Sequence, residues 1–136
     1  MKEHLFSKEY IAILEGILPN KKGTICANIK RKENSIIERC VDESGDNAVT
    51  HYELLDTKEK LSIVKLILET GRTHQIRVHC AYMNHPILGD TLYGNTSSLI
   101  ERQALHAYKV SFIHPINKNQ VSYIADIPED MKIGIY

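Results

Sequence analysis

The stretch TGRTHQIRVH, residues 70–79, constrains the fold of this chain more than any other. Residues 61–68, just before it, alternate side chains as a strand does, and a Thr-Gly pair then signals a turn. Thr73 is placed to cap a helix that carries residues 75–83 before Pro86 ends it. The sequence therefore predicts a strand, a tight turn and a helix N-terminus in immediate succession.

Cationic groups gather at the predicted helix N-terminus. Arg72, His74 and Arg77 line this end of the helix, where backbone N–H groups have no partner inside the helix. Residues 70–86 hold two arginines, three histidines and no carboxylate. A helix N-terminus with cationic side chains is suited to bind an anion. The formal net charge of zero argues against a protein that grips nucleic acid through its overall charge, but a local basic patch can still bind phosphates.

A family resemblance follows from these residues and the ones after them. TGRTHQIRVH followed by HPILGDTLYG (85–94) resembles the signature of the RluA-type RNA pseudouridine synthases. Further segments stand in the family's order and at about its spacing: KEYIAILEG (8–16), AVTHY (48–52), RQALHA (102–107), His114-Pro115 and Ile127-Pro128. Several ordered motifs make the resemblance far more specific than a single one.

The chain also departs from the family pattern. The family's catalytic aspartate lies in a His-Arg-Leu-Asp segment upstream of the tyrosine strand, and no such segment occurs in the 136 residues. At residues 45–48 the sequence is Gly-Asp-Asn-Ala, where the family usually has a lysine after the glycine. We therefore expect residues 1–136 to form the C-terminal portion of a pseudouridine synthase catalytic domain, a single domain truncated at its N-terminus and inactive alone.

The resemblance implies a role for several residues. Tyr10 matches the family's aromatic platform for a uridine flipped out of its stack, and Arg77 matches the arginine that pairs with the catalytic aspartate. Leu105 corresponds to the apolar residue that lines the uracil pocket, and its alternative reading is ordinary strand core. Contacts with RNA phosphates, or bracing of the motif loop, are the expected roles of Arg72, His74 and Gln75. No cofactor is expected, because the reaction is a rearrangement without net redox change.

The pattern of the whole chain predicts an α+β fold, a mainly antiparallel sheet with one or two packed helices. Residues 8–16 are apolar on both parities, which is typical of a strand covered on both faces. The expected strands are 8–16, 24–29, 36–41, 50–55, 61–68, 105–113 and 120–127. Residues 30–32 are expected in a solvated loop, 56–60 in a hairpin link and 115–119 in a turn.

Other chemistry is less well supported by the sequence. His74 and His79 are five residues apart and thus roughly 140° apart around a helix, which does not suit a metal site, so no metal is expected. Asp90 follows a glycine and is expected in a turn rather than as a nucleophile. Cys80 is expected to pack within the helix, and all three cysteines to be reduced thiols.

The functional prediction is an isomerase that converts uridine to pseudouridine in ribosomal or transfer RNA. The alternative is a non-catalytic RNA-binding module or one half of a split enzyme, since the catalytic aspartate is missing. The sequence shows no apolar run of membrane-spanning length and no signal-peptide pattern, so we expect a cytoplasmic protein without a membrane partner. A homo-oligomer formed through an uncovered sheet edge is also expected.

Overall fold

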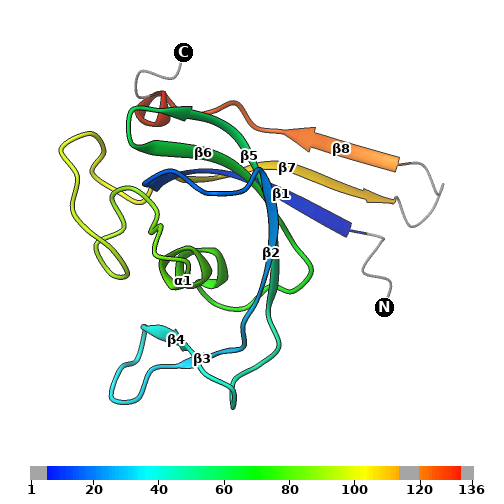
Figure 1. Cartoon of the computed structure of the whole chain (residues 1–136). Coiled ribbons are helices and arrows are strands. Elements are labelled where there is room, and N and C mark those ends of the chain that lie inside the picture. Colours follow the sequence, from blue (N-terminus) through cyan, green and yellow to red (C-terminus); the bar gives the residue numbers. More distant parts are fainter. Residues whose placement is uncertain (1–5, 114–119, 133–136) are drawn as a thin grey trace.

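A computed structural model describes residues 6–113 and 120–132 (Figure 1). Its elements, in chain order, are β1 (Phe6–Glu15), β2 (Lys22–Cys26), β3 (Ile29–Arg31), β4 (Arg39–Val41), β5 (Val49–Lys58), β6 (Leu61–Leu68), α1 (Gln75–Tyr82), β7 (Leu105–Ile113), β8 (Gln120–Ile124) and a 3-10 turn (Glu129–Met131). Six strands form one antiparallel sheet in the order β2-β5-β6-β1-β7-β8. The expected α+β class is confirmed.

Strand β1 lies in the interior of this sheet and is buried on both faces, as its sequence predicts. Ile11, Ala12, Ile13 and Leu14 are each at most 9 % exposed. Its neighbours β6 and β7 pair with it along most of its length. The apolar segment 11–14 of β1, between two paired strands, forms the buried centre of the sheet.

Helix α1 packs on one face of the sheet and also contacts β4 (Figure 1). The face is identified by Thr50 of β5, whose side chain bonds to two residues of α1. Side chains that are register partners, or two residues apart on a strand, share a face. Tyr52 is two residues from Thr50 and pairs with Leu66, which in turn pairs with Tyr10. Tyr10 therefore lies on the helix side of the sheet.

Residues 24–41 differ most from the sequence prediction. The expected strand 24–29 is interrupted after Cys26, and β3 begins at Ile29, where the backbone bonds to Asp46. Residues 30–31 belong to β3 and pair with β4, so the expected loop at 30–32 was largely wrong. The expected strand 36–41 is reduced to Arg39–Val41. All three differences arise because residues 29–31 and 39–41 form a separate two-stranded hairpin.

The other strands shift mainly at their ends. β5 extends through Lys58, so the β5–β6 connection is a tight turn at residues 59–60 rather than a five-residue link. Glu59 has a φ of 55° there, which such a turn requires. β8 ends at Ile124, earlier than expected, whereas β7 spans the expected residues. The expected turn at 115–119 lies outside the described residues.

The helix begins differently from the prediction. His74, not Thr73, is the N-cap residue, and it adopts the left-handed conformation with φ 56° and ψ 22°. No side chain caps this end; instead the Arg72 carbonyl oxygen accepts the Gln75 N–H at 3.0 Å. Within the described residues, no helix has the length and apolar character needed to cross a membrane.

Candidate active site

Gln75 braces the turn that leads into α1. Its Oε1 accepts hydrogen bonds from the Thr70 hydroxyl at 2.8 Å and the Arg72 N–H at 3.0 Å. Its Nε2 donates to the Val49 carbonyl at 3.0 Å and the Thr50 hydroxyl at 2.9 Å. The side chain is 2 % exposed, so its amide is fully engaged inside the fold. Of the two expected roles of Gln75, this geometry supports bracing of the loop and leaves no group free for a phosphate.

His79 extends the same network into the core. The ring is fully buried, with Nε2 2.8 Å from the Ala27 carbonyl and Nδ1 2.8 Å from the Thr50 hydroxyl. Because a carbonyl only accepts, Nε2 carries the proton and Nδ1 accepts from Thr50. Burial lowers the pKa of His79, and the bond to Ala27 only partly opposes this. His79 is thus a neutral structural histidine that joins α1 to β5.

We expect stability to fall as the pH drops below about 6.5, because unfolded His79 then takes up a proton that the folded protein excludes. The contribution is fully present above that pH and is lost toward the lower pKa of the folded state. The slope for one histidine is at most about 1.4 kcal/mol per pH unit. Urea unfolding at pH 7.5 and 5.5 measures it.

Two variants assign the pH effect to His79. His79→Gln should be less stable at pH 7.5 and show a smaller loss between the two pH values. Thr50→Val removes the hydroxyl that bonds Nδ1, keeps the histidine, and should cost roughly 1–3 kcal/mol while the pH dependence keeps its sign. Equal pH slopes for the parent and His79→Gln would exclude His79 as the source.

Arg77, the residue matched to the family's aspartate-binding arginine, already holds a carboxylate. Its Nε lies 2.9 Å from Asp90 Oδ2 and its Nη2 lies 2.8 Å from Oδ1. The Asp90 side chain is completely buried, and that of Arg77 is 17 % exposed. Asp90 Oδ1 also accepts the N–H groups of Leu92 and Tyr93, each at 3.2 Å. Asp90 therefore has the expected turn role and, in addition, fixes the guanidinium.

The ionised state of this pair is held by its hydrogen bonds. Burial acts to raise the pKa of Asp90, but the bonds from Arg77 and from the Tyr93 and Leu92 N–H groups together bring it below its usual value. The hydrogen bond to Asp90 raises the pKa of Arg77. One edge of the guanidinium, Nε with Nη2, is thereby occupied. Nη1 makes no hydrogen bond to any of the described residues and is therefore available to a second acceptor.

Tyr93 connects Arg77 with the helix N-terminus. The Arg77 guanidinium carbon lies 5.2 Å from the centre of its ring. Its hydroxyl lies 2.7 Å from His74 Nδ1 and accepts the Arg39 N–H at 2.8 Å. Burial, followed by the charges of Arg77 and Arg39, lowers the pKa of His74. His74 is therefore mainly neutral near pH 7, and the expected phosphate contact would not come from a protonated ring.

Arg72 is the member of the predicted patch that is exposed to solvent. Its Nε donates to the Asn47 carbonyl at 2.7 Å, which ties the turn before α1 to the loop before β5. The remaining guanidinium nitrogens face solvent without a carboxylate partner among the described residues. Of the three expected cationic groups, Arg72 is thus the exposed one, and no carboxylate among the described residues pairs with it.

Tyr10 and Leu105 are brought together on neighbouring strands. Tyr10 pairs with Ala107 and Leu105 pairs with Ala12, so both side chains lie on the helix side of the sheet, diagonal to each other. Both are partly buried and pack against the main core. Arg77 lies on α1, which covers the same side of the sheet. The three residues thus come from three elements that share one side of the sheet.

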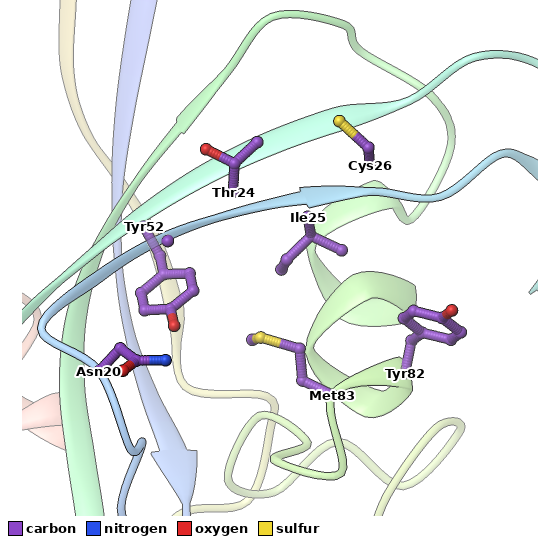
Figure 2. A pocket seen from close by; sticks show the side chains of 8 residues that line it. Asn20, Thr24, Ile25, Cys26, Tyr52, Tyr82 and Met83 are labelled. Atoms are coloured by element: carbon purple, nitrogen blue, oxygen red, sulfur yellow. The ribbon is translucent and has the colours of Figure 1, made fainter.

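A separate cavity of about 410 Å³ lies between β2, β5 and the end of α1 (Figure 2). Ile25, Tyr52 and Met83 are among the side chains that line it, and none of the predicted site residues does.

Cys80 lies in helix α1, and burial raises the pKa of its thiol to about 12, as suits a packing residue. Among the described residues, no cluster of His, Cys, Asp and Glu is arranged to hold a metal ion.

Comparison with known proteins identifies the family. Residues 1–82 match the family model described as RNA pseudouridylate synthase. The chain is 46% identical over 130 residues to the uncharacterized RNA pseudouridine synthase YjbO of Bacillus subtilis. This alignment covers 96% of this chain and 46% of that protein. It is 37% identical over 145 residues to the ribosomal large subunit pseudouridine synthase D of Zymomonas mobilis, covering 96% of this chain and 44% of that protein.

A solved structure supports the same family assignment. Human RNA Pseudouridylate Synthase Domain Containing 1 superposes with a TM-score of 0.79 at 29% identity, over 92% of this chain and 56% of that one. The chain belongs to the RNA pseudouridylate synthase family, and its relatives place it with the RluA-type members. It spans less than half the length of these two curated relatives.

Proposed function

We propose that this chain supplies the helix-bearing part of the catalytic domain of an enzyme that converts uridine to pseudouridine in ribosomal or transfer RNA. Arg77 carries the proposal. Its Nε and Nη2 are fixed by a buried carboxylate at 2.9 and 2.8 Å, while its other edge is available. A guanidinium held in this way is suited to orient a second carboxylate and keep it ionised.

The reaction breaks the bond between the ribose and uracil N1, turns the released ring and joins it to the ribose through C5. In the proposed site Tyr10 supports the flipped uracil, Leu105 borders it, and Arg77 holds the nucleophilic aspartate. That aspartate is not among the 136 residues in the family's His-Arg-Leu-Asp context. Asp90 is a poor substitute because both of its oxygens are engaged.

We expect the 136-residue chain alone to form no pseudouridine. Tritium release from C5 of labelled ribosomal and transfer RNA measures the reaction. The companion protein is a chimera that places, before Met1, the part of YjbO that precedes the residues matched by this chain, and it should show turnover. Release by the purified chain alone would contradict the proposed division of the site.

The alternative, a non-catalytic RNA-binding module, rests on the absence of that aspartate from the 136 residues. It predicts RNA binding by the chain and no turnover by the chimera. Turnover by the chimera decides for the enzyme. A chimera that neither binds RNA at low salt nor turns over contradicts both functions.

A further inference from the structure

The tip of the β3–β4 hairpin exposes two adjacent isoleucines. Ile36 is 84% exposed and Ile37 is 59% exposed, and Ile36 is the most exposed large apolar side chain of the described residues. Figure 1 shows the hairpin on the far side of α1 from the sheet. Single exposed apolar residues are ordinary, but two neighbours on a projecting tip indicate a contact surface.

The tip is held in a fixed shape before any partner binds. Arg39 Nη1 donates to the carbonyl oxygens of Ile36 at 3.3 Å and Ile37 at 3.1 Å. The Lys32 N–H donates to the Glu38 carbonyl at 2.8 Å and closes the loop. A preformed tip loses little conformational entropy when it binds.

The charges on the hairpin favour an anionic partner. Arg31 is directly opposite Arg39, so two guanidinium groups share one face. Like charges at opposite positions destabilise a strand pair. Arg31 is exposed, and no carboxylate partner for it was found within the described residues. Lys30 lies on the other face, where it is 3.9 Å from Asp42. A phosphate near Arg31 would relieve the repulsion.

The hairpin is also fixed relative to the candidate active site. The Arg39 N–H bonds to the Tyr93 hydroxyl, and the Tyr93 ring lies against the Arg77 guanidinium. At its base, Ile29 is buried in a cluster with Val78 of α1 and Ala48. Movement of the hairpin relative to Arg77 would disrupt both contacts, so the tip is a rigid neighbour of the site.

We propose that this hairpin binds the RNA strand next to the target uridine, with Ile36 and Ile37 packed against unstacked bases and Arg31 on a phosphate. The proposal rests on the function proposed above. Apolar side chains inserted at base steps are an established means of opening nucleic acid stacks. A second copy of the chain fits less well, because pairing two tips would bring their arginines together.

The test uses the 136-residue chain and an RNA stem-loop with 2-aminopurine in the loop, whose fluorescence rises when bases unstack. The double variant Ile36→Ser, Ile37→Ser should lose the rise and bind roughly tenfold more weakly. Arg31→Gln should keep the rise at saturation and reduce the salt slope by about 0.7. Leu99→Ser alters a side chain that is 52% exposed and lies outside the hairpin. This control variant should leave the fluorescence rise, the affinity and the salt slope unchanged.

The outcomes separate this inference from the function on which it rests. RNA binding by the parent, with the double variant unchanged in affinity and fluorescence, overturns the hairpin proposal alone. Absence of RNA binding by both the parent and the YjbO chimera at low salt overturns the proposed function as well. If the double variant alters only self-association, measured by light scattering, the occupant is a second copy and the RNA proposal is wrong.

Discussion

Asp90→Ala is expected to lower the free energy of unfolding by about 3–5 kcal/mol, because it leaves the charge of Arg77 without its buried partner. The loss comes from more than one bond. Asp90 accepts two hydrogen bonds from Arg77, and its Oδ1 also holds the turn through the Leu92 and Tyr93 N–H groups. Urea unfolding at pH 7.5 measures the difference.

A second ion pair provides the control. Arg102 and Asp130 also form a two-point pair, at 3.0 and 2.9 Å, but their side chains are 39% and 48% exposed. Exposed pairs contribute about 0–1 kcal/mol, so Asp130→Ala should have a small effect. If Asp90→Ala costs no more than Asp130→Ala, burial does not strengthen the pair as we infer.

A double-mutant cycle isolates the pair itself. Arg77→Met removes the charge that lies 5.2 Å from the centre of the Tyr93 ring and keeps an unbranched side chain. The double variant Arg77→Met, Asp90→Ala should be more stable than the sum of the single losses predicts, because no buried charge is left unpaired. Additive losses would mean that Asp90 acts only through its turn bonds.

The sequence predicts the sheet well because its central strands are long and apolar. Residues 8–16 and 61–68 predict β1 and β6, because apolar character or alternation extends over eight or more positions. The expected strand 36–41 contains β4, but the β3–β4 pairing is not predicted. Each strand has three residues, too few for a period, and the Lys-Arg-Lys run is typical of a loop. Short strands depend on tertiary pairing that a local pattern does not contain.

The site was predictable in its residue types and less so in its contacts. Arg77 and Gln75 were found from the motif, but their partners are remote in sequence: Asp90 is 13 residues from Arg77, and Thr50 is 25 residues from Gln75. His79 and Gln75 are polar and yet buried, because β5 supplies their bonding partners. The glycine before Asp90 predicts the turn but not the carboxylate's partner: Gly89 has φ 79°, and a Cβ added there would lie 2.3 Å from the Arg102 carbonyl oxygen.

Arg77→Lys is expected to reduce turnover about a hundredfold in the YjbO chimera, with little change in RNA affinity. Lysine keeps the charge but loses the planar fork that Asp90 engages at 2.9 and 2.8 Å. Its ammonium cannot hold two carboxylates in fixed directions, so the catalytic aspartate would be misplaced rather than neutralised. Single-turnover rates at saturating enzyme measure this step.

Arg72→Lys should show the opposite pattern, because Arg72 is exposed and contacts no carboxylate among the described residues. Loss of its Nε bond to Asn47 loosens a surface turn and weakens one phosphate contact, so affinity should fall modestly while the rate on bound RNA is kept. The two variants both change arginine to lysine within one motif, and they differ in burial and in partner. If Arg77→Lys instead weakens binding and leaves the single-turnover rate unchanged, Arg77 is a phosphate ligand, and the carboxylate it orients in the fold is Asp90 alone.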